Sequence, residues 1–275
     1  MTSGGGMGYK CHKRTLYSTL VPSNFAQMSD QVEFYGFTPV PRDPDVLFRD
    51  HPTANAPATV TQTVEDFPFP ESPLVREVET FVTRELDQLT INHSKRVYIY
   101  GMAIVKLHFP SWSFDPETYY LACLLHDIGT AERFLLKTKL SFEFKGAIVA
   151  RDLLLQLGSV EDQADSVCDA IVRHQDIFVI GGNITVIGQV LQLATILDNV
   201  GLRANLIHPK LMETALAKFS GKGWMEKFAT VIETELRAKP WCHTSSFEHP
   251  NWREGDASQF ATDVRKNDLL HKLAE

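Results

Sequence analysis

The chain has 275 residues, of which 44% are hydrophobic and 22% are charged, so it can bury the core of one large domain or two small ones. Its net charge of −7 offers no overall positive field, which argues against nucleic acid and anionic membrane surfaces as partners. No uncharged apolar run reaches the roughly 18 residues that a membrane-spanning helix needs.

The four cysteines indicate a reducing compartment. Cys11, Cys123, Cys168 and Cys242 have no paired spacing, and three of them lie in or beside apolar runs, where buried free thiols are common. The first residues lack the apolar segment of a secretory signal. We therefore expect a cytoplasmic protein, with a mitochondrial transit peptide as the alternative because the chain is basic before Asp30.

Residues 1–70 are expected to form an irregular N-terminal arm. They are rich in Gly, Pro, Thr and Ser, and prolines as dense as those at 39–44 are unfavourable for helices and central strands. Residues 1–27 are expected to be dispensable. Residues 71–250 are predicted to form the structured domain, followed by a C-terminal tail at 251–275.

Apolar residues recur at three- and four-residue intervals from about residue 72 onward, which predicts helices. Asn92 is the expected N-cap of the second helix, and the pair Asp115-Pro116 is expected to open a third one that runs to His126. Further helices are expected at about 145–157, 163–175, 185–200, 209–219 and 224–237. Because Val and Ile follow helical spacing rather than alternation, the predicted fold class is all-α.

The adjacent pair His126-Asp127 closes the apolar run 119–125. An imidazole and a carboxylate are poor packing residues at the end of a buried helix, but they are good ligands for a divalent metal. His93 lies on the apolar face of its own helix, so it should point into the core. It is expected there either as a further metal ligand or as a satisfied core histidine.

Two more polar residues end apolar helical faces. Asp198 follows the apolar segment 187–197, where an ionised carboxylate needs a cation or several strong donors. Its alternative role is to cap a neighbouring helix or to pair with Arg173. His174 could bind a second metal, contact a substrate or cap its helix. Substrate contact or acid–base catalysis is favoured because histidine titrates near neutrality.

Two His and two Asp from three helices resemble the metal site of HD domains, whose pattern is H…HD…D. Here the pattern reads His93, His126-Asp127 and Asp198. Six blocks further resemble the fungal cyanamide hydratases, a branch of the HD-domain proteins. These blocks are 92–97, 123–130, 139–143, 170–176, 193–201 and 239–244. The resemblance covers roughly residues 32–247, and the blocks Ser141-Phe142-Glu143 and Pro240-Trp241-Cys242-His243-Thr244 lie outside the general HD pattern.

The resemblance implies an HD-domain helical bundle that hydrates cyanamide to urea, a hydro-lyase reaction suited to detoxification. The zinc ligands that it implies are His93, His126, Asp127 and Asp198. Iron or manganese would suit the same nitrogen and oxygen ligands. The divalent ion would lower the pKa of a bound water and so generate the hydroxide that attacks the nitrile carbon.

The resemblance suggests a role for His174 near the substrate, and the chemistry of nitrile hydration suggests the other roles around the metal. Asp127 and His174 are the expected catalytic residues, with His174 as the proton donor to the nitrile nitrogen. Thr130, Asn199 and His174 are the expected substrate-binding residues. The expected partners are a small-molecule nitrile and water, and the sequence leaves the oligomeric state open, a homo-oligomer included.

Three alternative functions remain at this point. An HD-type phosphohydrolase acting on a nucleotide would need cationic groups around the phosphate, and candidates near the ligand-bearing segments are Arg96, Arg133, Lys137 and Arg173. A hydratase for another nitrile or for an isocyanide would share the fold and the ligands. A non-catalytic HD module usually lacks a ligand, whereas all four ligand positions are filled here.

Two segments are ambiguous. The segment from Gly129 to Phe144 could roof the pocket or serve as an amphipathic connector. Cys242 beside His243 is reminiscent of a thiol nucleophile with its base, but sequence neighbours seldom form such a pair, so core packing is favoured.

Overall fold

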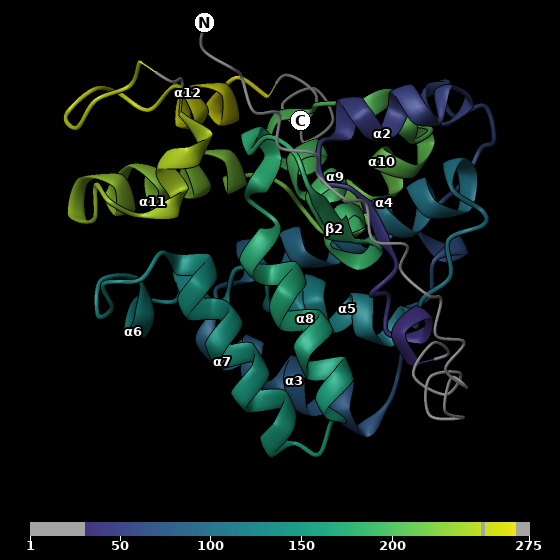
Figure 1. The fold of residues 1–275 in the computed structure, drawn as a ribbon, viewed down its shortest axis with the longest axis horizontal. Helices are drawn as coiled ribbons and strands as arrows, with labels where there is room; N and C mark the ends of the chain where they lie inside the picture. Colours follow the sequence, from purple (N-terminus) through teal and green to yellow (C-terminus); the bar gives the residue numbers. More distant parts are fainter. Residues whose placement is uncertain (1–30, 249–250, 268–275) are drawn as a thin grey trace, which may run out of the picture.

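The computed structural model describes residues 31–248 and 251–267, and almost all regular structure in these ranges is helical (Figure 1). The longer helices are α3 Pro73–Glu85, α4 Gln88–His108, α5 Pro116–Leu125, α7 Phe142–Gln156, α8 Glu161–Arg173, α9 Val186–Val200, α10 Pro209–Lys218 and α11 Trp224–Ala238. Shorter helices are α2 Pro44–Asp50, α6 Glu132–Leu135 and α12 Gln259–Arg265, and the two strands are β1 Pro39–Pro41 and β2 Asn183–Thr185. Single 3₁₀ turns are η1 Pro52–Asn55, η2 Val64–Asp66, η3 Ile128–Thr130, η4 Asp176–Phe178, η5 Ala204–Leu206 and η6 His243–Phe247. The predicted all-α class is confirmed.

Several helices, α4 and α5 among them, begin at a residue whose side chain caps the first amides. Asp115 caps α5 by accepting hydrogen bonds from the backbone amides of Glu117 and Thr118, as predicted. The predicted cap of α4 is wrong. Asp87, not Asn92, accepts from the first amides of this helix, which therefore begins about one turn earlier. Asn92 lies inside the helix, and its side chain donates to a backbone carbonyl of the segment before α11.

The core forms where α4, α5 and α9 pack together, as the centre of Figure 1 shows. α7 and α8 lie side by side, both contact α5, and α8 also packs against α9. α10 lies against α4, and α12 pairs with α11 and contacts α9. Most residues of α5 and α9 are buried whichever way they point. Because these two helices are buried all round, every polar side chain on them needs a partner inside the protein.

Part of the predicted irregular arm is regular, so that prediction is wrong for residues 39–50. β1 pairs antiparallel with β2, with Val40 opposite Ile184. α2 is capped by Asp43 and has Pro44 at its first position, where proline lacks only an amide that would be unpaired anyway. The proline-rich composition therefore permitted a short edge strand and a proline-initiated helix. Residues 1–27 lie outside the described residues.

The C-terminal segment also packs against the domain. Phe260, Ala261 and Val264 of α12 are buried, and the rings of Phe260 and Phe247 stack with centroids 4.1 Å apart. Residues that pack against the domain thus lie on both sides of residues 70 and 250. The domain boundaries expected there stay predictions from sequence.

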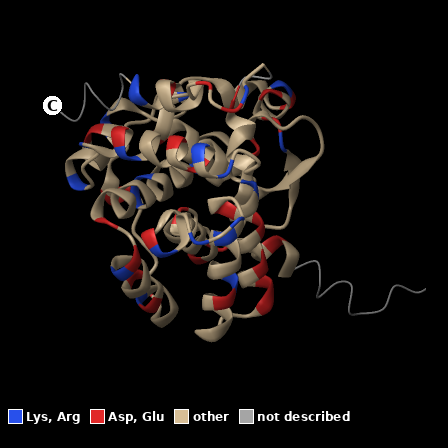
Figure 2. Cartoon of the chain, turned by 90° about the vertical axis from the view of Figure 1, so that its left-hand side faces the viewer, with Lys and Arg blue, Asp and Glu red and all other residues tan. Residues whose placement is uncertain are grey.

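Charged residues of both signs are spread over the surface. On the side shown in Figure 2, Lys and Arg are interspersed with Asp and Glu rather than gathered into a continuous basic stripe. Among the described residues, no helix is both long enough and apolar enough to cross a bilayer.

Candidate metal centre

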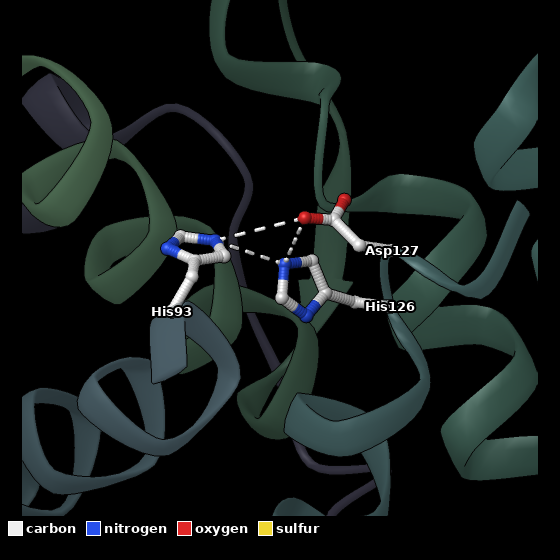
Figure 3. Close-up of side chains that lie close together, drawn as sticks. All are labelled: His93, His126 and Asp127. Carbon is white, nitrogen blue, oxygen red and sulfur yellow. Dashed lines mark hydrogen bonds and ion pairs between the residues drawn. The ribbon is translucent and has the colours of Figure 1, made fainter. Parts of the chain in front are cut away.

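The pair His126-Asp127 lies where α5 ends. His126 is the C-terminal cap of α5, and Asp127 has φ −98° and ψ 8°, between that helix and the turn η3. This backbone break turns both side chains toward His93, which lies in the second turn of α4 (Figure 3). None of the three residues is more than 1% exposed. They are the described His, Cys, Asp and Glu residues whose ligand atoms lie close enough together to hold one metal ion.

The three ligand atoms form a compact triangle. His93 Nε2 lies 3.2 Å from His126 Nε2, and Asp127 Oδ2 lies 3.3 Å and 3.8 Å from His126 Nε2 and His93 Nε2. Ligands about 2.1 Å from a tetrahedral ion are themselves about 3.4 Å apart. The separations therefore suit three ligands of one divalent ion.

The hydrogen bonds made by Nδ1 of His93 and His126 determine which nitrogen of each ring keeps a lone pair. His126 Nδ1 donates to the Cys123 carbonyl at 2.8 Å, and His93 Nδ1 donates to a carboxylate oxygen of Asp198 at 2.6 Å. In the neutral rings the Nε2 atoms are then acceptors. Both buried carboxylate oxygens of Asp127 also lack a hydrogen-bond donor. Three electron-pair donors thus face one another, an arrangement that needs a proton or a metal ion between them.

The pKa shifts agree with this demand for positive charge. Burial alone would raise the pKa of Asp127, but His126 and His93 outweigh it and lower that pKa below its usual range. Burial also opposes a charge on His126, yet Asp127 outweighs it and raises the pKa of His126. For His93, burial dominates and lowers the pKa, which favours the neutral, ligating ring.

The structure places Asp198 behind His93 rather than inside the triangle. Its two carboxylate oxygens accept from Arg96 Nε at 2.8 Å and from Arg96 Nη2 at 2.7 Å, in addition to the bond from His93. Although burial raises the pKa of Asp198, Arg96 lowers it to about 2. Asp198 therefore orients His93 in the way that carboxylates orient metal-bound imidazoles. Its role as a direct fourth ligand stays a prediction.

The alternative pairing of Asp198 with Arg173 is wrong. Arg173 instead donates to Asp176 and to the Asn183 carbonyl. The true partner, Arg96, was missed, although it follows His93 by three residues and so shares its helix face. A cation on an apolar helical face was the available signal for a buried ion pair.

An aromatic side chain completes the support of His93. The Trp224 ring stacks on the His93 ring with centroids 4.2 Å apart and an interplanar angle of 15°. Trp224 is in turn held by Asn199, whose side-chain oxygen accepts the indole N–H at 2.9 Å. Asn199 is thus placed to fix Trp224, and its expected contact with substrate stays a prediction. Nothing in the local sequence around Trp224 indicated this stack.

His174 lies beside the cluster but outside its ligand triangle. Its ring centroid is 5.2 Å from that of His126, and its Nδ1 donates to the Ile171 carbonyl at 2.6 Å. Burial, followed by the nearby His126, lowers the pKa of His174 to about 4. This lowered pKa favours the uncharged ring at neutral pH, and because Nδ1 donates, the lone pair lies on Nε2. The expected role of His174 as a proton donor stays a prediction.

Thr130 holds the turn that follows the ligand pair. Its hydroxyl donates to the Asp127 carbonyl at 2.7 Å, and its amide donates to the same oxygen. The substrate contact expected of Thr130 is not tested by these bonds. α7 lies tightly on this turn, because a Cβ on Gly129 would overlap the carbonyl oxygen of Phe142.

The class of protein follows from this metal centre together with two sequence comparisons. The sequence model of the HD domain matches residues 90–200, which include His93, the His126-Asp127 pair and Asp198. Cyanamide hydratases DDI2 and DDI3 of Saccharomyces cerevisiae are each 42% identical to this chain over 213 residues, covering 77% of this chain and 91% of the relative. The chain therefore belongs to the HD-domain family of the cyanamide hydratases.

Proposed function

We propose that this protein hydrates cyanamide to urea, as a hydro-lyase with zinc held by His93, His126 and Asp127. The observation that carries the proposal is the buried ligand triangle in a chain 42% identical to two cyanamide hydratases. Iron or manganese would suit the same donor atoms. We further propose a detoxifying role in the cytoplasm, with a small nitrile and water as partners, and we leave the oligomeric state open.

The reaction needs a nucleophile at the nitrile carbon and a proton at the nitrile nitrogen. A divalent ion at the triangle would supply Lewis acidity, lowering the pKa of water and polarising the nitrile. We propose that His174 accepts a proton from the attacking water through Nε2 and returns it to the nitrile nitrogen. The bond from its Nδ1 to the Ile171 carbonyl, which leaves the lone pair on Nε2, supports this role. The isourea so formed becomes urea by moving its hydroxyl proton to nitrogen.

Burial of the site favours a very small substrate. His174 is 5% exposed, and the three ligands are more deeply buried still. Four surface hollows of about 470 to 640 Å³ lie elsewhere, and none of these four is lined by the ligands or by His174. A linear nitrile needs far less room than the few hundred Å³ of a pocket for a drug-sized ligand such as a nucleotide. Another small nitrile or an isocyanide would satisfy the same limit.

Three of the four cationic groups expected for a nucleotide phosphohydrolase are engaged elsewhere. Arg96 is fully occupied by Asp198 and two backbone carbonyls. Arg133 pairs with Glu85, and Arg173 pairs with Asp176. These three side chains do not converge on the metal centre, which argues against phosphate chemistry there.

The proposed function is tested by incubating the purified, metal-analysed protein with cyanamide and measuring urea. We expect stoichiometric conversion that stops after chelation and returns on adding zinc, iron or manganese, whichever is native. Organic nitriles, an isocyanide and nucleoside triphosphates are the comparison substrates. Release of phosphate or pyrophosphate from nucleotides without any urea from cyanamide would refute the proposal.

Replacing His174 with glutamine separates catalysis from metal binding. We expect turnover to fall by about 10²–10⁴-fold, the usual contribution of a general acid–base group, while bound metal stays at the wild-type level. His208→Gln is the matched control, because His208 caps the remote helix α10. Loss of metal in His174→Gln would instead make His174 a ligand.

A further inference from the structure

Three of the sequence blocks that resemble the cyanamide hydratases meet at His243. This residue begins η6, and both nitrogens of its ring face carboxylates: Nδ1 lies 3.0 Å from Glu143 Oε1, and Nε2 lies 3.3 Å from Asp176 Oδ1. Ionised carboxylates accept hydrogen bonds and do not donate, so this geometry favours a cationic ring that donates from both nitrogens, although burial raises the pKa of Glu143. The His243 amide also donates to Ser141 Oγ at 2.6 Å, and its ring stacks on Phe144.

This environment excludes a Cys242–His243 catalytic pair. The imidazole is committed to two carboxylates. Burial raises the pKa of the Cys242 thiol to about 11, so the thiol stays protonated at neutral pH. The preference for packing at Cys242 therefore agrees with its burial, and His243 has a different role.

Each carboxylate partner belongs to one wall of the metal centre. Glu143 is completely buried and lies next to Phe142. The Phe142 ring lies 6.0 Å from the His174 ring, and the Phe142 carbonyl lies against the turn after Asp127. Asp176 begins η4, two residues after His174. The cation of His243 thus joins the start of α7 to the turn behind His174.

We propose that His243 is a positioning residue of the hydratase site. Held between Glu143 and Asp176, it fixes the turn that carries His174 against the α7 wall that supports the ligand pair. The inference rests on the proposed function in that it concerns His174 during nitrile hydration. A base displaced by about 1 Å can lose roughly 10²-fold in rate, so a modest shift of this turn is enough to matter.

The charges around His243 favour its protonated form. Hydrogen bonds to Asp176 and Glu143 raise the pKa of His243 to about 9. The other charged or titratable groups near the two carboxylates are Glu235 with its partner Lys239, Arg42, Arg173, Asp169 and Cys242. The folded-state pKa of His243 exceeds its ordinary value of about 6.5. The stabilisation that the His243 cation gives between Glu143 and Asp176 is therefore fully present below about pH 6.5 and is lost as the pH rises through about 9.

The test compares wild type, His243→Gln and Glu143→Gln in the metal-loaded enzyme, from pH 6 to about 10.5. We expect His243→Gln to lower kcat about 10–100-fold with a smaller change in KM and unchanged metal content, and to lose the alkaline decline of kcat near pH 9. Glu143→Gln keeps the side-chain shape but removes one carboxylate. It should move that decline to lower pH, and it serves if His243→Gln does not fold.

Arg265→Gln is the matched control for stability. Arg265 joins α12 to Glu226 and Glu233 of α11, neither of which is a site residue described above, so its loss should lower the melting temperature without changing the pH profile. A readout independent of activity is the Cε1–H NMR signal of His174, assigned by its absence in His174→Gln. This signal should shift in His243→Gln but not in Arg265→Gln.

The outcomes are distinguishable. Wild-type kcat and an unchanged His174 signal in His243→Gln would overturn the positioning role, as would rate losses that merely parallel the melting temperature in His243→Gln and Arg265→Gln. If wild type forms no urea, the proposed function fails. The His174 signal and its shift near pH 9 still decide whether His243 positions this residue.

Discussion

His126→Ala and Asp127→Ala should each abolish metal binding and urea formation together. Each removes one of three donor atoms that lie within 3.8 Å of one another, and the remaining pair cannot enclose a divalent ion. Loss of an outer-shell partner already costs roughly 10–100-fold in metal affinity, so loss of a direct ligand should exceed that range. Metal analysis after dialysis and the urea assay measure both effects.

Thermal unfolding shows whether the loss is local. Added metal should raise the melting temperature of the wild type, because a hundredfold excess over Kd stabilises the folded state by about 2.7 kcal/mol. The melting temperatures of the two ligand variants should not change. Asp50→Ala, which removes an exposed carboxylate on α2, is the matched control and should keep metal, activity and the response. Full activity in a metal-free His126→Ala protein would contradict the proposed mechanism.

Arg96→Met should lower both the free energy of unfolding and the affinity for metal. The substitution leaves the Asp198 carboxylate buried without its cation, a change that typically costs about 3–5 kcal/mol. Arg96 also donates to the carbonyls of Phe219 and Ser220, which lose a donor. Because Asp198 would then be free to protonate or turn, the hold on His93 should loosen and metal affinity should fall roughly 10–100-fold.

A double-mutant cycle isolates the ion pair. Asp198→Asn removes the buried charge while keeping an oxygen for His93, so Arg96→Met together with Asp198→Asn should cost less than the sum of the single changes. Urea denaturation of the metal-free proteins and competition with a chelating dye measure the two quantities. Additive effects, or a loss below about 1 kcal/mol for Arg96→Met, would contradict this account of the pair.

Patterns that repeat within one helix were predictable from sequence. The capping pair Asp115-Pro116 and the apolar run that follows it place α5 and end it at His126, because capping and helical periodicity act over a few residues. His93 is completely buried for the same reason. Where two residues could serve as caps, as with Asp87 and Asn92 of α4, local chemistry alone did not distinguish them.

Pairings between distant segments were not predictable. Asp198 and His93 are 105 positions apart, and a carboxylate at the end of α9 could equally have met Arg173 or the metal. Which cation it reaches depends on how α4 and α9 cross, a property of packing. The same holds for α12 and for residues 39–50, whose short elements form because the folded body offers an edge strand and an apolar surface.

By itself the sequence determined an all-α domain, the helix that carries His126-Asp127, and the inward placement of His93, because spacing and capping set each helix and its buried face. The tertiary structure alone decided that Arg96 and Asp198 orient His93 from behind and that Trp224 stacks on its ring. It also placed His243 between Glu143 and Asp176. These contacts join residues far apart in the chain, and burial makes each polar group take whichever partner the packing brings within reach.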